Sequence, residues 1–442
     1  MIYLIENFRI ALFLISWFAA VSSIVFTSAD HFLIYVGVSS FFLFLLITLV
    51  YVNRQSLIII SFLLFIYIIT VDLRPTFEDI IEAGKYILIF AGLIPTMGLV
   101  RSTAQKLNNV KQCQALLSKL SKDSFASGFQ ITAHFFGAVI NTGVFAMLAA
   151  AMPPKSSAKY RQKVAEASLR GMSSSATWSP FFVAFVVGQV YLDSRSAWLG
   201  LAIGLFMGSI FSLLSVVLLN KKLTYEKFKL SLACLKPVFS TLTLIIVLVV
   251  SAAMIFGLTA LSAVVVVMPI LVGSYFLTKP KHFKPIMIDT VQYLKKSTDD
   301  VVIISFAMIV GYLVTNSPET LTKFQKLNLF AIPEWLILIF IPVTMATVSL
   351  IGVHPVISST ILLSTFISLN FDISAPLLMQ AHLLGWCTGT MSSIASLSVI
   401  TCSKLFQIPS SKLCYGINGY TTISFAVVGG VILTLLNQLI NL

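Results

Sequence analysis

The chain of 442 residues is 58% hydrophobic and only 10% charged, and its mean hydropathy is +0.97. A globular chain carries roughly 25% charged residues, so a soluble protein of this composition could not cover its surface with polar groups. The composition therefore excludes a nucleic-acid-binding protein, a secreted disulfide scaffold and a disordered regulator. It predicts an all-α polytopic membrane protein. The five cysteines have no CxxC spacing, so we expect neither a disulfide framework nor a metal site.

Nine apolar runs each approach the ~20 residues that a helix needs to cross the hydrocarbon of a bilayer. These runs are 10–28, 31–52, 56–73, 84–100, 197–220, 236–257, 259–278, 301–316 and 413–440. Two other stretches, 124–194 and 333–405, are rich in Ser, Thr, Gly, His and Pro and do not resemble simple spans. Together they predict about 11 transmembrane helices, two of them broken.

Lysine and arginine gather on one side of these spans. With the N-terminus in the cytoplasm, the cytoplasmic segments hold 24 of the 29 basic residues. Those segments are 1–9, 53–55, 101–123, 153–170, 221–236, 279–296 and 404–412, and the other five basic residues are Arg74, Lys85, Arg195, Lys323 and Lys326. This bias predicts a multi-pass protein of the cytoplasmic (inner) membrane with a cytoplasmic N-terminus. It also accounts for the net charge of +13 without nucleic acid as a partner; the partner that we expect is the lipid bilayer.

The charge pattern also predicts a re-entrant hairpin. Segments 101–123 and 153–170 both fall on the cytoplasmic side, so the apolar stretch 124–152 between them enters and leaves the membrane on the same side.

The two unusual stretches are related to each other in sequence. Residues 166–171 (EASLRG) match 380–385 (QAHLLG) in three of six positions at an offset of 214, and a cluster of small hydroxyl residues follows each. Upstream, Ile140-Asn141-Thr142 faces Ile357-Ser358-Ser359 at an offset of 217. By the charge pattern the two stretches have opposite orientations, which predicts the inverted-topology repeat typical of secondary transporters.

The predicted organisation follows from this repeat. An extra N-terminal helix (1–30) precedes a first repeat, 31–220, with a re-entrant hairpin at 124–152 and a broken helix at 163–194. A second, inverted repeat, 236–442, has its hairpin at 333–370 and its broken helix at 376–405.

Hairpin tips and broken helices are the places where a transport site is expected. Backbone that lipid cannot satisfy is tolerated only inside protein or around a water-filled cavity, and half-helix ends there can bind ions and substrate. We expect the substrate to be bound by Asn141, Thr142, Gly143, Ser174, Ser175, Thr177, His354, Ser358, Ser359, Thr388, Thr390 and Ser392. We expect the coupling ion to be bound by Asn141, Ser173, Gly389 and Thr360. The competing interpretation is that Ser, Thr and Gly only mediate close helix packing.

Three histidines, His134, His354 and His382, lie in these same stretches. A histidine near a transport site can carry a coupling proton because it titrates near neutral pH, and His354, beside Pro355, is the strongest candidate. The alternative is that each is a buried ring with its hydrogen bonds satisfied.

Charged side chains are scarce at the predicted mid-depth. No Asp or Glu falls there, Glu166 being the nearest, and we expect no buried arginine. Cation antiporters and proton pumps usually need an intramembrane carboxylate. The pattern therefore favours a small anionic substrate held by neutral donors together with Na⁺ or H⁺ as coupling ion, and no other cofactor.

The arrangement resembles the ion transporter superfamily, and most closely its divalent-anion:sodium symporter branch, in which each hairpin tip carries a Ser-Asn-Thr motif. Asn141-Thr142 keeps two of the three positions, whereas Ile357-Ser358-Ser359 has no Asn. The resemblance implies binding of Na⁺ and a substrate carboxylate at the tips. It also implies a homodimer and an elevator movement of the hairpin domain.

Two other functions stay open. One is an exporter or antiporter of the same fold. The other is a membrane-embedded glycan polymerase or acyltransferase, but such enzymes typically need a large extracytoplasmic loop, and the longest one predicted here is 317–332. We therefore expect a transporter and not an enzyme.

The hairpin prediction has a direct test. Single cysteines introduced at Ser118 and at Ser157 should both react with a membrane-impermeant thiol reagent applied from the cytoplasmic side. Labelling of the two positions from opposite sides of the membrane would contradict a re-entrant 124–152.

Overall fold

The computed structural model describes residues 2–26, 30–71, 74–153, 155–220, 222–317, 332–369, 371–394 and 396–440. All regular elements in these ranges are helices. Eight of the described helices are long and apolar enough to cross a membrane, or nine if a bent pair counts as one span. The prediction of an all-helical polytopic membrane protein is therefore confirmed, whereas the count of 11 spans stays a prediction.

The chain forms two compact units. Unit 1 comprises 1–103, 247–331 and 363–370, and unit 2 comprises 104–246, 332–362 and 371–442. Each unit takes segments from both predicted repeats. This division by contact does not test the predicted repeat boundaries, since two related repeats can share one compact unit.

Unit 1 is built mainly from the apolar helices nearest the N-terminus. Its helices are α1 (Ile2–Val25), α2 (Asp30–Leu49), α3 (Arg54–Thr70), most of α4 (Phe77–Ala104), the end of α12 (Lys236–Phe256), α13 (Ala260–Thr278), the 3₁₀ turn η2 (Pro280–His282), α14 (Phe283–Lys296), α15 (Thr298–Thr315) and the end of α18 (Pro355–Ser368). Phe13 of α1 stacks on Phe41 and Phe44 of α2, with ring centroids 5.7 and 4.7 Å away. Asn53 caps α3 and also donates through its side-chain amide to Asp299 of α15.

Unit 2 holds both stretches that are rich in small polar residues. Its helices are α5 (Asn108–Ser118), α6 (Lys122–Ile140), α7 (Gly143–Ala150), α8 (Ala158–Ser175), α9 (Val183–Tyr191), α10 (Ser194–Leu219), α11 (Tyr225–Ala233), the start of α12, α17 (Glu334–Leu350), the start of α18, α19 (Ala375–Ser392), α20 (Leu397–Phe406), α21 (Ser410–Tyr415) and α22 (Ile417–Ile440). The predicted run 413–440 is thus interrupted at Gly416.

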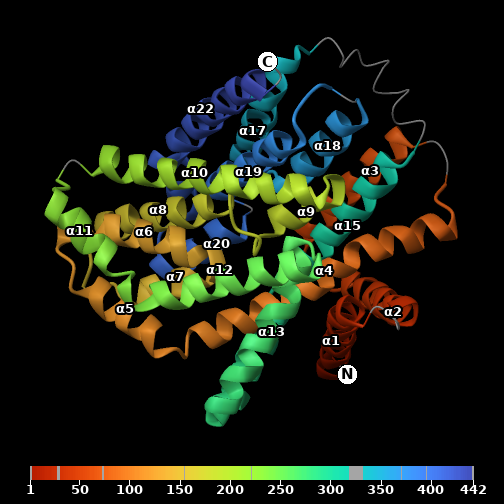
Figure 1. The fold of residues 1–442 in the computed structure, drawn as a ribbon, viewed down its shortest axis with the longest axis horizontal. Helices are drawn as coiled ribbons and strands as arrows, with labels where there is room; N and C mark the ends of the chain where they lie inside the picture. The colour runs from red at the N-terminus through yellow and green to blue at the C-terminus, as the bar shows by residue number, and fades with distance from the viewer. Residues whose placement is uncertain are drawn as a thin grey trace. The chain divides into compact units, whose positions relative to one another are not determined.

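Close backbone approach holds the first half of unit 2 together. In Figure 1, α6, α8 and α10 lie side by side. A Cβ atom on Gly171 of α8 would stand 2.1 Å from the backbone oxygen of Gln130 in α6. A Cβ atom on Gly204 of α10 would stand 1.8 Å from the backbone oxygen of Thr177. Only glycine permits these approaches, because any larger residue would overlap the neighbouring backbone.

The start of α6 is fixed by polar contacts outside the predicted spans. Lys227 Nζ lies 2.9 Å from Asp123 Oδ2, and this contact lowers the pKa of the Asp123 carboxyl below its ordinary value. Asn220 donates to the Asp123 carbonyl over 2.6 Å and to the Ser127 hydroxyl over 2.8 Å. The hairpin helix is thereby attached at its base to the segment that follows α10.

The same order of elements occurs twice in unit 2. Two helices joined by a short turn (α6–α7 and α17–α18) are followed by a helix of 18 residues (α8 and α19). After a break comes a shorter helix (α9 and α20) and later a long one (α10 and α22). The predicted repeat and its inverted orientation across a membrane both stay predictions.

The glycine contacts predict a stability difference between two variants. Gly171→Ala should destabilise the fold by about 2–3 kcal/mol, because the new methyl group overlaps a backbone oxygen. Gly273→Ala in α13 is the matched control: nothing lies within 4 Å of its added Cβ, and the helix should gain about 0.5–1 kcal/mol. Thermal unfolding of the purified variants measures both, and equal melting temperatures would contradict the packing described.

Candidate functional site

The residues predicted to form a transport site all lie in unit 2. Most of them lie at the two turns between paired helices, in the first turns of α18 and at the ends of α8 and α19, whereas His134 and His382 lie inside α6 and α19. We describe these places in turn.

The first predicted tip is the turn between α6 and α7. Asn141 ends α6 with φ 50° and ψ −134°, and Thr142 follows with φ −56° and ψ −16°. These angles are close to a type II′ turn, whose first central residue favours Gly or Asn. Gly143 then begins α7, and the Thr142 side chain does not cap that helix. A turn between helices thus lies at Asn141 and Thr142, and its role as the tip of a re-entrant hairpin stays a prediction.

The second turn is displaced from the prediction. It falls between α17 and α18, at 351–354, where Gly352 has φ +95°. Ser358, Ser359 and Thr360, expected at the tip, instead lie within α18. The turn forms earlier because Gly352 adopts the left-handed conformation and Pro355 starts the next helix. In position, Gly352 and not Ser358 is therefore the counterpart of Asn141.

His354 lies at this second turn, as predicted. Its Nδ1 accepts from the backbone N–H of Val356 over 3.2 Å, so the ring caps the start of α18. The side chain is 9% exposed and packs edge-on against Trp386, with centroids 6.3 Å apart.

The hydroxyl cluster of α8 lies in its last turn, just before the break. Ser173, Ser174 and Ser175 are helical and Thr177 lies beyond the helix end. The Thr177 hydroxyl is 2.8 Å from the Ser174 carbonyl and 2.9 Å from the Gly204 carbonyl. Ser174 Oγ lies 2.8 Å from His134 Nδ1.

The second cluster occupies the same place in α19. Thr388, Gly389, Thr390 and Ser392 lie in the last two turns of that helix, and the break begins at Ser393. The hydroxyl of Ser392 donates to the Thr388 carbonyl over 2.9 Å, and that of Ser396, past the break, donates to the Thr390 carbonyl over 2.8 Å. Both clusters thus surround the carboxyl end of a half-helix, where free carbonyl groups favour a cation.

Two of the histidines connect helices within the unit. His382 of α19 lies 2.8 Å from the Ala184 carbonyl through Nε2 and 3.0 Å from Ser359 Oγ through Nδ1. Because a carbonyl only accepts, Nε2 carries the proton and Nδ1 accepts from the serine. His134 lies between Ser174 and Ser209 Oγ, the latter at 3.2 Å. These neutral rings have their hydrogen bonds satisfied, which supports the structural interpretation; their role as proton carriers stays a prediction.

Several buried hydroxyl groups have no hydrogen-bond partner among the described residues. They include those of Ser173 and Thr360, both predicted to bind the ion, and those of Ser349 and Thr422, which the sequence did not single out. The same holds for Thr132 and Ser212 elsewhere in unit 2 and for Thr48 and Ser305 in unit 1. Ser173, Thr360, Ser349 and Thr422 are each at most 3% exposed. An unsatisfied buried hydroxyl costs about 1–3 kcal/mol, so such groups are typical of sites that a ligand or ion completes. Ser349 lies close to Gly389: a Cβ on that glycine would be 2.7 Å from Ser349 Oγ.

The expectation that no arginine is buried is wrong. Arg170 of α8, counted among the cytoplasmic basic residues, is 4% exposed and donates to Asn418 Oδ1 over 2.7 Å. Glu166, one turn earlier, is 7% exposed. The sequence could not show this burial, because it is created by α22, 248 residues further along the chain.

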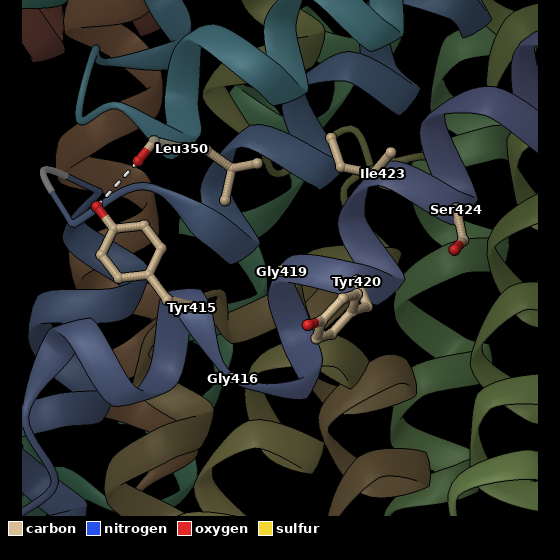
Figure 2. Close-up of a pocket in the computed structure, with 7 residues that line it drawn as sticks. All are labelled: Leu350, Tyr415, Gly416, Gly419, Tyr420, Ile423 and Ser424. Carbon is tan, nitrogen blue, oxygen red and sulfur yellow. Dashed lines mark hydrogen bonds between the residues drawn. The ribbon is translucent and has the colours of Figure 1, made fainter.

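Two cavities open on unit 2. One of about 400 Å³ lies at the start of α22 and is lined by Leu350, Tyr415, Gly416, Gly419, Tyr420, Ile423 and Ser424 (Figure 2). Another of about 640 Å³ is lined by Glu334, Trp335, Leu338, Asp372, Thr434, Asn437 and Gln438. Neither is lined by a predicted site residue.

No protein-family model matches the chain, and no curated protein matches its sequence. In structure, the chain is similar to the YdaH transporter of Alcanivorax borkumensis, whose crystal structure has an unusual topology. The two share 12% sequence identity, the match covers 87% of this chain and 95% of that one, and the TM-score is 0.44.

The conformation of Asn141 predicts how its variants fold. Asn141→Gly should keep or slightly raise the melting temperature, because glycine adopts a positive φ without strain. Asn141→Ala should destabilise the fold by about 1 kcal/mol. Thermal unfolding of the two variants beside the wild type tests this, and a less stable glycine variant would mean that the Asn141 side chain, not its backbone, holds the turn.

Proposed function

We propose that the protein is a secondary active transporter that moves a small anion across the cytoplasmic membrane by symport with Na⁺ or H⁺. The anion class that we propose first is a carboxylate. The observation that carries the proposal is the gathering of the first predicted hairpin, most of the second and both broken helices in one compact unit. A helix that is interrupted inside an apolar bundle leaves backbone N–H and C=O groups without hydrogen-bond partners. Transporters use such places to bind ions and substrate.

The site favours Na⁺ as the coupling ion. Hydroxyl and carbonyl oxygens are hard ligands, and both clusters place them at the carboxyl ends of half-helices. The hydroxyls of Ser173 and Thr360, buried without a partner among the described residues, are available as such ligands. H⁺ coupling through His354, His134 or His382 is the alternative.

The anionic substrate is supported by helix amino ends. The turn at Asn141 leads into the amino end of α7, which no Thr142 side chain caps. Amino ends of helices present N–H groups and a partial positive charge to an anion. Thr142 and Gly143, with His354 before α18, are the donors that we assign to the substrate. The hydroxyls of Ser358 and Ser359 already donate to the Pro355 carbonyl and to His382 Nδ1, so they would contact the substrate only through their free lone pairs.

An elevator movement is part of the proposal. The first hairpin, most of the second and both broken helices belong to unit 2, whereas the first helices, α1 to α3, belong to unit 1. A division of this kind suits a transport unit that moves as one body against a scaffold. The homodimer rests on the family resemblance alone.

Two alternative functions stay open beside the symporter. An exporter or antiporter of the same fold would use the same site with the opposite direction of flux. A membrane-embedded glycan polymerase or acyltransferase would need catalytic side chains on an extracytoplasmic loop; the loop predicted for that role, 317–332, lies almost wholly outside the described residues.

The first experiment measures the melting temperature of the purified protein with acetate, succinate, citrate, glutamate, phosphate or sulfate, each with NaCl and with choline chloride. A ligand that binds the folded state raises its stability, by about 2.7 kcal/mol at 100 times its Kd. We expect carboxylates to raise the melting temperature only with Na⁺, and Asn141→Ala to lose this increase. Asn141→Gly is the matched control, because it separates loss of the amide from strain in the turn.

Other outcomes would redirect the proposal. An increase that ignores Na⁺ but follows pH would favour proton coupling through the histidines. No response to any anion would contradict the anion site and favour the exporter or enzyme.

A further inference from the structure

The broken helix α8 carries a buried positive charge. Arg170 is 4% exposed, and two neutral amide oxygens accept from its guanidinium: Asn418 Oδ1 from Nη1 at 2.7 Å and Gln130 Oε1 from Nε at 3.3 Å. Among the described residues, the guanidinium forms no ion pair with a carboxylate. A buried charge is costly unless it is paired, so this guanidinium lacks a counter-charge in direct contact.

The nearest acidic side chain is already engaged. Glu166 precedes Arg170 by one turn on the same helix face, and its Oε1 accepts from Gln162 Nε2 over 2.9 Å. The carboxylate therefore lowers the local positive potential without occupying the guanidinium.

The amides that hold Arg170 are themselves fixed. Gln130 Nε2 donates to the Ser212 carbonyl over 2.9 Å and also to Ser215 Oγ. Asn418 Nδ2 donates to the Glu166 carbonyl over 3.4 Å. Neutral acceptors on α6 and α22 thus orient the guanidinium without neutralising it. Asn418 is the second residue of α22, so the positive end of that helix adds to the same potential.

A donor without a partner lies one turn further along α8. Ser173 follows Arg170 by three residues, a spacing that places the two on neighbouring positions of one helix face. Its side chain is fully buried, and its hydroxyl has no partner among the described residues. A hydroxyl without a partner and a guanidinium without an ion pair therefore occupy neighbouring positions of one helix face.

A cavity lies close to this place, at the start of α22. Gly416 and Gly419 line the cavity of about 400 Å³ (Figure 2), while Asn418 between them is fully buried. A Cβ on Gly416 would stand 2.6 Å from Glu166 Oε1. The first turn of α22 therefore separates the cavity from the buried Glu166 and Arg170.

We propose that Arg170 is an anion-binding residue of unit 2, whose guanidinium, with the Ser173 hydroxyl, binds a carboxylate group that enters from the cavity at the start of α22. This inference rests on the proposed anion transport and names the residue that provides the substrate's counter-charge. The planar guanidinium matches the two oxygens of a carboxylate. Glu166 repels the same anion, which keeps binding reversible.

The test compares two neighbouring charges that should act in opposite directions. Arg170→Gln should weaken binding of the carboxylate that stabilises the wild type by about 30-fold or more. Arg170→Lys, which keeps the charge but not the fork, should retain weak binding. Glu166→Gln should strengthen binding by about threefold, because it removes a repelling charge. Kd values come from melting temperatures over a series of succinate, citrate, glutamate and acetate concentrations, with sulfate as a tetrahedral comparison.

The outcomes separate this inference from the proposed function. If no carboxylate stabilises the wild type, both fail. If the wild type responds and Arg170→Gln binds with an unchanged Kd, only the role of Arg170 is overturned. If Arg170→Gln does not fold, Glu166→Gln decides: stronger binding supports the site, and unchanged or weaker binding overturns it, because a purely structural charge would not change affinity in that direction. A response to sulfate alone would overturn the assignment to a carboxylate.

Discussion

Backbone hydrogen bonding in an apolar environment is the constraint on which the rest of unit 2 depends. Every interruption of a helix leaves N–H and C=O groups that lipid cannot satisfy. Here side chains supply the partners: Thr177 donates to two carbonyls at the first break, Ser396 donates to the Thr390 carbonyl at the second, and His354 accepts from the start of α18. The clusters of small hydroxyl residues therefore have a structural role before they have a binding role. The hydroxyls without a hydrogen-bond partner, such as that of Ser173, are the ones that remain available to bind an ion or a substrate.

Glycine complements these hydroxyls by bringing backbones together. Gly204 allows α10 to approach the Thr177 carbonyl, and Gly171 allows α8 to approach the Gln130 carbonyl. Close approach of this kind gives a unit that is rigid although its helices are broken. A rigid body that holds both breaks suits the elevator movement proposed, because the site can move without losing its geometry.

Among the described residues of unit 2, the buried charges are those of Glu166 and Arg170, one turn apart on α8. The guanidinium of Arg170 is oriented by amides from α6 and α22, while the nearby carboxylate of Glu166 is bound by Gln162. A guanidinium that is held by neutral oxygens keeps its positive charge, which a bound anion can neutralise. A site made only of hydroxyls and helix ends would bind anions more weakly, since hydrogen bonds to charged groups are about twice as strong as neutral ones.

Composition, hydropathy and charge bias by themselves determined that this is an all-helical polytopic membrane protein, and they predicted the long apolar helices and the first turn at Asn141. These signals are local, because a span needs only about twenty consecutive apolar residues and a positive φ favours Asn or Gly at one position. Gly352 and Pro355 are the local signal for the second turn. The alignment of Ile357-Ser358-Ser359 with Ile140-Asn141-Thr142 instead predicted the turn a few residues too late. The burial of Arg170, the partners of His382 and the hydroxyls left unpaired were decided only by the tertiary structure. They depend on side chains that approach from helices far away in the sequence, such as Asn418 on α22, and no local pattern encodes which helix will cover which face.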